Sequence, residues 1–164
     1  MSKSPHPPGA PHPPGAPHPP GGVFDGPLHL YAVRVYYEDT DLSGIVYHAN
    51  YLRWFERARS DVLRMLGIDQ RAAIETGGGA YAVADMQLKY LRPARLDDDV
   101  VIRTLCTQMK AASVTMHQRA IRGSELLCDA HLRIGFVAPS GRPVRQPQPW
   151  RDAFETILLQ EETE

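Results

Sequence analysis

The strict alternation of side chains in residues 126–136 constrains the fold of this chain more than any other stretch. Apolar residues occupy every second position of the segment, namely Leu126, Cys128, Ala130, Leu132, Ile134 and Phe136. The positions between them are largely polar. Because successive side chains of a strand point to opposite faces, this pattern predicts a strand with one buried face and one exposed face. Such strands are typical of antiparallel sheets that are covered on one side.

Four further segments upstream have the composition of strands. They are residues 28–37, 80–92, 99–109 and 113–122. The stretch "RGSE" at 122–125 places glycine first in a two-residue turn, which favours a type II′ hairpin. Most connections between these segments are short. Short connections favour antiparallel pairing, because parallel strands need long crossovers.

Residues 48–66 change to a helical period. The apolar positions of this stretch are Tyr51, Phe55, Ala58, Val62 and Met65. Spacings of three and four residues place these side chains on one stripe and predict a long amphipathic helix, which ends at Gly67. A shorter helix is expected from Trp150 onward. We therefore expect an α+β fold, with a five-stranded antiparallel sheet and one long helix on its apolar face.

The first 27 residues differ from the rest. Residues 5–22 consist of the hexapeptides PHPPGA, PHPPGA and PHPPGG. Proline lacks a backbone donor and has a restricted φ, so we expect residues 1–27 to form a disordered tail. Six residues of polyproline helix span roughly 19 Å, which separates the tail histidines too widely for one metal ion. The domain is expected over residues 28–147, followed by a helical extension over 148–164.

Composition excludes several classes of protein. The chain has 164 residues and a formal net charge of −1, so no global positive field favours nucleic acid or an anionic membrane. No apolar run approaches the roughly 18 residues of a membrane helix, and no signal peptide is apparent. Cys106 and Cys128 lie in predicted strands, which favours reduced, packed thiols, although neighbouring strands would permit a disulfide. These features predict a cytoplasmic protein.

The segment "EDTDLSGIVYHANYLRWFERARS", residues 38–60, concentrates polar residues just before the long helix. A helix N-terminus presents unpaired N–H groups and a positive dipole end, which suit a developing oxyanion. A carboxylate placed there can activate water as a base or attack a carbonyl as a nucleophile. An aspartate before a helix is more often a cap or turn residue. The residues alone therefore leave the roles of Asp39 and Asp41 open.

Three stretches carry a resemblance to a known family. They are "YYEDTDLSGIVYHANYLRWFERARSD", "LKYLRPARLDDDVVIRT" at 88–104, and "SGRPVRQP" near the C-terminus. Together they resemble the hotdog-fold thioesterases of the 4-hydroxybenzoyl-CoA thioesterase superfamily, specifically the YbgC branch that is associated with the Tol-Pal system. The resemblance covers residues 28–147. It implies a hotdog fold, in which a curved five-stranded antiparallel sheet wraps around one long helix, and a homodimer or homotetramer.

The resemblance also implies an activity and its residues. It implies hydrolysis of short- to medium-chain acyl-CoA, aromatic acyl groups included, without a metal or redox cofactor. Asp41 would be the catalytic base or nucleophile, with His48 as the second catalytic residue and a backbone N–H near His48 polarising the thioester carbonyl. Asp39 is interpreted as a loop or capping residue. The residues expected to contact substrate are Gly44, Val46, Tyr47 and Lys110.

Coenzyme A carries phosphates, so a cationic rim is expected around the site. The candidates are Lys89, Arg92, Arg95, Lys110 and Arg119. His29, His117 and His131 lie on predicted strands with no partner at metal-ligand spacing, and we interpret them as structural. The sequence therefore predicts no metal site.

Two alternative functions stay open. An enoyl-thioester hydratase with the same fold would also place an acid and a histidine at an acyl thioester. A binding module would instead engage acyl carrier protein, lipid-synthesis enzymes or envelope machinery, with the proline tail as a docking element. Release of free thiol distinguishes hydrolysis from both alternatives.

Overall fold

The computed structural model describes residues 14–15 and 17–159, and the sheet and helices named here all lie within these ranges. The strands are β1 (Val23–Asp25), β2 (Leu28–Arg34), β3 (Ala80–Tyr90), β4 (Asp99–Lys110), β5 (Ser113–Arg122) and β6 (Glu125–Val137). The helices are the 3-10 turn η1 (Tyr37–Asp39), α1 (Asn50–Met65), α2 (Gln70–Glu75) and α3 (Gln148–Glu155). The strand order is β1-β2-β4-β5-β6-β3, and all neighbours are antiparallel.

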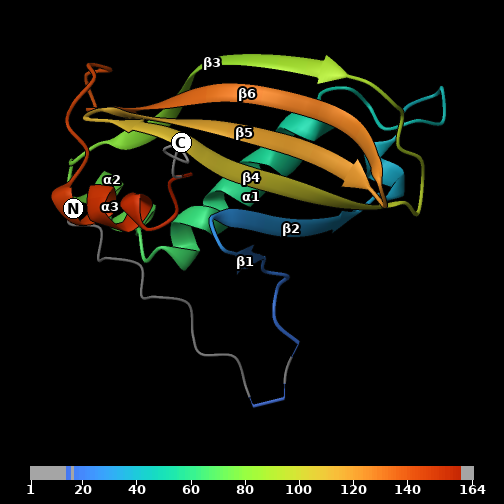
Figure 1. Cartoon of the computed structure of the whole chain (residues 1–164), viewed down its shortest axis with the longest axis horizontal. Coiled ribbons are helices and arrows are strands. Elements are labelled where there is room, and N and C mark those ends of the chain that lie inside the picture. Colours follow the sequence, from blue (N-terminus) through green and yellow to red (C-terminus); the bar gives the residue numbers. More distant parts are fainter. Residues whose placement is uncertain (1–13, 16, 160–164) are drawn as a thin grey trace, which may run out of the picture.

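The sheet curves over α1, as Figure 1 shows. This arrangement confirms the predicted α+β class and the long helix within a curved antiparallel sheet. Most of the predicted apolar stripe is buried, but Met65 is 45% exposed. Trp54 and Leu63 are buried in addition, because the buried arc of α1 is wider than one row of side chains.

The sheet has six strands rather than the predicted five, because Val23–Asp25 pairs with β2. A two-residue turn at 26–27 reverses the chain, and Gly26 adopts a φ of +56° there. Phe24 packs against the core and anchors this short edge strand. The prediction of a disordered tail over 1–27 is therefore wrong for residues 23–25. Residues 1–13 and 16 of that predicted tail lie outside the described residues.

A buried histidine–aspartate contact joins β2 to α1. His29 Nε2 lies 2.7 Å from Asp61 Oδ2, and the two side chains are 0% and 6% exposed. The Gly22 N–H donates to the same Asp61 oxygen at 2.8 Å. The structural interpretation of His29 is thus confirmed, and Asp61 is the partner that holds it. Its partner is 32 residues away in sequence and is reached only through the packing of helix on sheet.

The hairpin predicted at 122–125 is confirmed. Arg122 pairs with Glu125, and Gly123 adopts a φ of +59° in the turn. Beyond the turn, a register shift in the β5–β6 pairing buries Leu127 instead of the predicted Leu126. From Cys128 to Phe136 the predicted alternation holds. A β-bulge therefore interrupts the pattern only next to the turn.

The predicted C-terminal helix is present but shorter than expected. Helix α3 ends at Glu155, and its buried residue is Phe154. Ile157, just beyond the helix, is also buried. Residues 160–164 of the predicted extension lie outside the described part of the chain.

The state of the two cysteines and the character of the helices agree with what composition predicts. Cys106 and Cys128 are both free and buried, as predicted. Burial raises the pKa of each thiol to about 12, so both are held as neutral thiols. Among the described residues, no helix combines the length and the apolar character needed to cross a membrane.

Candidate active site

A tight hairpin in residues 40–48 carries the candidate catalytic residues to the N-terminal end of α1. Thr40 and Val46 form an antiparallel bridge across the hairpin. Gly44 closes its turn with a φ of +78°, and its N–H donates to the Asp41 carbonyl at 3.0 Å. A positive φ favours glycine, so Gly44 lets the chain turn tightly at this point.

The Asp41 carboxylate is exposed on this hairpin. Its Oδ1 accepts hydrogen bonds from the Ser43 hydroxyl and, at 2.8 Å, from the Ser43 N–H. These two bonds hold the pKa of Asp41 below its usual value, and the charge of His48 lowers it further. Among the described residues, Asp41 Oδ2 accepts no hydrogen bond. An ionised carboxylate with one unbonded oxygen is the form that a general base or nucleophile requires.

His48 is exposed beside two tyrosine rings. Its ring centroid lies 4.5 Å from that of Tyr47 and 6.2 Å from that of Tyr90. The Tyr90 hydroxyl donates to the His48 carbonyl at 2.8 Å. Tyr90 on β3 therefore holds the backbone at the start of α1, a role that sequence reasoning missed. The signal that could have found it is the tyrosine of the "LKYLRP" stretch.

The start of α1 leaves backbone donors unpaired. Ala49 is the N-cap and provides no side-chain cap, and the first turn contains no acid. Asn50 N–H donates to the Tyr47 carbonyl and Leu52 N–H to that of Ala49. Within the described chain, the N–H groups of His48 and Ala49 have no protein acceptor. Two adjacent donors at the positive end of a helix dipole can stabilise an oxyanion.

Asp39 is a structural residue, as the sequence predicted. It is 7% exposed. Its Oδ2 accepts from the Tyr36 N–H at 2.7 Å, and its Oδ1 accepts from the Asn50 side-chain amide. Asp39 therefore ties the 3-10 turn η1 to the start of α1, whereas Asp41 remains open to solvent.

The structure separates the expected substrate-contacting residues. Tyr47 is exposed beside His48, whereas Val46 is buried in the core and its N–H donates to the Ala94 carbonyl at 2.8 Å. The Val46 side chain therefore packs in the core beneath the hairpin and is not accessible to a ligand in this conformation.

Lys110 lies at the opposite end of the sheet. It is the last residue of β4, whose first residue, Asp99, pairs with Arg34 just before η1. Eleven residues of strand span roughly 36 Å. A single chain therefore does not bring Lys110 to the Asp41 loop.

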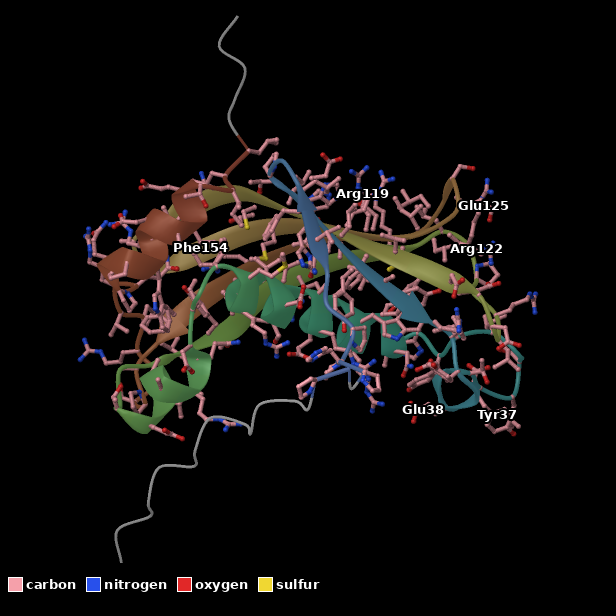
Figure 2. All side chains as sticks on the ribbon, turned by 90° about the horizontal axis from the view of Figure 1, so that it is seen from below. Tyr37, Glu38, Arg119, Arg122, Glu125 and Phe154 are labelled. Carbon is pink, nitrogen blue, oxygen red and sulfur yellow. The ribbon has the colours of Figure 1, made fainter. Side chains whose placement is uncertain are left out.

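The candidate cations divide into two groups. Arg95 forms a bridge with Ile45 of the loop, and Lys89 and Arg92 flank the β3 end that carries Tyr90. Arg119 lies in the middle of β5. Figure 2 shows it away from the Tyr37 and Glu38 side chains, which mark the end of the molecule that holds the loop. In the first group, Arg92 and Arg95 therefore lie at the end of the sheet that holds the loop, whereas Lys89 pairs with Asp129 and faces the outer side of the sheet.

The two remaining strand histidines are not isolated. His117 Nε2 lies 2.7 Å from Asp129 Oδ1, and His131 Nε2 lies 3.3 Å from Asp129 Oδ2. The expectation that they have no partner at ligand spacing is wrong. Antiparallel pairing of β5 with β6 places His117 opposite His131, an adjacency that spacing along one segment does not reveal.

A long helix inside a curved antiparallel sheet is the hotdog fold, and solved hotdog-fold structures match it. Residues 43–128 match the Thioesterase superfamily, and the chain belongs to this family. The resemblance found in the sequence is thereby confirmed.

Curated relatives support the YbgC branch. "Acyl-CoA thioesterase YbgC" of Haemophilus influenzae is 38% identical over 128 residues, which cover 77% of this chain and 94% of the relative. "Acyl-CoA thioester hydrolase YbgC" of Escherichia coli O6:H1 is 41% identical over 113 residues, covering 68% and 84%.

Solved structures share the fold. A probable thioesterase from Bartonella henselae is similar with a TM-score of 0.68 and 35% identity, covering 73% of this chain and 99% of that protein. A 1,4-dihydroxy-2-naphthoyl-CoA thioesterase from Synechocystis has a TM-score of 0.73 at 24% identity, covering 77% and 95%. The second likeness concerns the fold alone.

Proposed function

We propose that this protein hydrolyses acyl-CoA thioesters to a free acid and coenzyme A. The observation that carries the proposal is the ionised Asp41 carboxylate, with one free oxygen, in the hairpin that leads to two unpaired N–H groups at the start of α1. The relatives named acyl-CoA thioesterase and acyl-CoA thioester hydrolase support the substrate class.

In the proposed reaction, the thioester carbonyl oxygen accepts hydrogen bonds from the N–H groups of His48 and Ala49. Asp41 either takes a proton from the attacking water or attacks the carbonyl carbon itself. The carbon–sulfur bond breaks, coenzyme A leaves as a thiol, and water supplies the second oxygen of the acid. Tyr90 holds the His48 backbone so that the donors keep their direction. The reaction as written requires no metal or redox cofactor.

The acyl groups in this proposal are short- to medium-chain ones, aromatic ones included, as the resemblance implies. A groove of about 110 Å³ lies between α1 and the strands β3 and β6, and Glu56, Arg59 and Ser60 line it together with Leu63, Val83 and Ile134. Glu56 is six residues beyond the first residue of α1, which corresponds to about 9 Å along the helix. In this proposal the acyl group runs from the oxyanion donors toward the groove, and Arg92 and Arg95 bind the phosphates.

We also propose a homodimer in which a second copy covers strand β3. Within the described sheet, β3 pairs with β6 along one edge and leaves the other edge open. Val83, Tyr90 and Leu91 are each about half exposed there. Because an unpaired edge promotes association, a second copy would satisfy it and enclose the His48 loop that Tyr90 contacts. Sedimentation at a single-chain mass would contradict this arrangement, and a tetramer would extend it.

Thiol release from a panel of acyl-CoA esters tests the function. Replacing Asp41 with Asn should lower kcat by about 10²- to 10⁴-fold, because the base or nucleophile is lost. Glu38→Gln is the matched control, since Glu38 is exposed and lies three residues away. Wild-type turnover by the Asp41 variant contradicts the site. Conversion of an enoyl thioester without thiol release contradicts hydrolysis and favours a hydratase.

Similarity to the YbgC branch leads us to propose three further properties of this protein. They are a cytoplasmic location, a link with the Tol-Pal system, and contact with acyl carrier protein. Cell fractionation and co-purification from the native cell test each of them separately.

A further inference from the structure

A cluster on the outer face of the sheet stands apart from the proposed active site. It consists of His117 on β5 with Asp129 and His131 on β6. His117 follows the buried Met116, and His131 precedes the buried Leu132. The three side chains therefore point away from the core, on the sheet face opposite α1.

Donor atoms of these three side chains converge. One ligand atom from each residue lies within 4.8 Å of the others. The two imidazole rings stack with centroids 4.1 Å apart and an interplanar angle of 10°. Both Nε2 atoms lie next to the Asp129 carboxylate, one beside each oxygen. The arrangement comes from an i, i+2 pair on one strand and the facing residue on the next strand.

The donor types of this cluster suit a metal ion of intermediate ligand softness, such as Zn²⁺. Arg119 of β5 and Lys89 of β3 each pair with Asp129 across the strands. A bound ion requires an ionised carboxylate and neutral imidazoles, so it would take the place of the His117–Asp129 hydrogen bond. Imidazole nitrogen together with carboxylate oxygen is a donor set for Zn²⁺ and related divalent ions.

Distances are close to those of a bound ion. Four-coordinate Zn²⁺ with ligands at about 2.0–2.1 Å requires donors roughly 3.3 Å apart. The separation of 3.3 Å between His131 Nε2 and Asp129 Oδ2 has this value. His117 Nε2 lies 2.7 Å from the other oxygen, Oδ1, so the bound state requires this contact to open and the stacked rings to tilt toward a common ion. A three-residue set leaves one coordination position for water.

We propose that His117, Asp129 and His131 form a binding site for a divalent transition metal ion of the Zn²⁺ type, on the outer face of the sheet. The site would clamp β5 to β6. It does not depend on the function proposed for Asp41, so the two can fail separately.

Cobalt titration of the full-length chain tests the proposal. The tail histidines His6, His12 and His18 could bind metal themselves, so all three are replaced by Ala in a background protein of full length. This background should bind one Co²⁺ per chain, seen as visible absorption bands, and Zn²⁺ should displace it. Thiolate bands should be absent, because both cysteines are buried.

Three variants in this background assign the ligands. His131→Ala is expected to fold, since its side chain is 59% exposed, and it should weaken Co²⁺ binding at least about tenfold. His117→Ala and Asp129→Asn should do the same. Asp85→Asn is the matched control, because Asp85 is a carboxylate of the same sheet face that pairs with Arg133. It should bind Co²⁺ like the background.

Either of two results overturns the proposal. One is a background protein that binds no Co²⁺. The other is a folded His131→Ala protein that binds Co²⁺ as tightly as the background does. Excess Zn²⁺ should also raise the Tm of the background and leave that of His131→Ala unchanged, since a ligand stabilises only the state that binds it.

Discussion

Two acid–histidine pairs lie next to helix α1, one in the hairpin before it and one between it and β2, and they have opposite properties. Asp41 and His48 lie in the hairpin before the helix, seven residues apart, and both are exposed. Asp61 and His29 are 32 residues apart and almost completely buried. One Asp41 oxygen is unbonded within the described chain, whereas Asp61 Oδ2 is shared by His29 and the Gly22 N–H. Residue type is the same in both places, so burial and bonding decide the role.

Solvation explains this difference. A buried charge is tolerated only when it is paired and hydrogen-bonded, so the Asp61 pair is committed to holding the helix on the sheet. An exposed carboxylate has no such requirement and can exchange water for substrate. The comparison therefore predicts that changes at Asp61 act on stability and that changes at Asp41 act on turnover.

The largest expected effect is at Asp61. Asp61→Ala leaves the buried His29 and the half-buried Gly22 N–H without their partner and should lower the free energy of unfolding by about 3–5 kcal/mol. Urea unfolding measures this loss. The comparison variant Asp41→Asn should change the unfolding free energy by less than about 0.5 kcal/mol. Equal destabilisation by both variants would remove the distinction between the two pairs.

A smaller loss of stability is expected at Gly22. A Cβ atom there would lie 2.5 Å from His29 Nε2 and 2.5 Å from the Leu30 carbonyl oxygen. Gly22→Ala should therefore cost about 1–3 kcal/mol by overpacking the buried pair. Gly21→Ala is the matched control, because its Cβ would meet Asp61 Oδ1 at an ordinary 3.7 Å. Gly22→Ala should have a clearly lower Tm than Gly21→Ala. Equal Tm values would show that the close contacts at Gly22 do not limit stability.

At the exposed pair, Tyr90→Phe tests whether the position of the His48 backbone matters for turnover. It removes the hydrogen bond to the His48 carbonyl, worth about 1 kcal/mol, and should lower kcat/KM by about fivefold. The effect should fall on kcat, because Tyr90 positions the oxyanion donors. Tyr37→Phe is the control, since Tyr37 is 83% exposed. A drop of the same size in the control would point to a general effect of losing a surface hydroxyl.

The smallest effect is a shift in pH dependence. The Ser43 hydroxyl is the main reason that the pKa of Asp41 is low. In Ser43→Ala the pKa should rise toward its usual value, so the ionised form is lost at a higher pH as the pH falls. The acidic limb of the kcat/KM profile should therefore move to higher pH, with little change near neutrality. An unmoved limb would show that Asp41 does not set it.

Prediction from sequence succeeded where the relevant residues are neighbours along the chain. The β6 alternation and the α1 stripe follow from periods of 2 and 3.6 residues. The hairpin before α1 brings Asp41 toward His48 through seven residues of loop. Strand β1 was missed because three residues after a proline repeat carry too little pattern, and pairing with β2 is what orders them.

The sequence by itself determined the order of β2 to β6 and the helices α1 and α3, most of their buried positions and the acid–histidine loop before α1, because these depend on local periodicity and turn chemistry. Only the tertiary structure decided which distant groups meet. Strand order placed His117 against Asp129 and His131, helix packing placed Asp61 against His29, and the β3 edge placed Tyr90 against His48. Such contacts arise from the packing of whole elements, which no short stretch of sequence encodes.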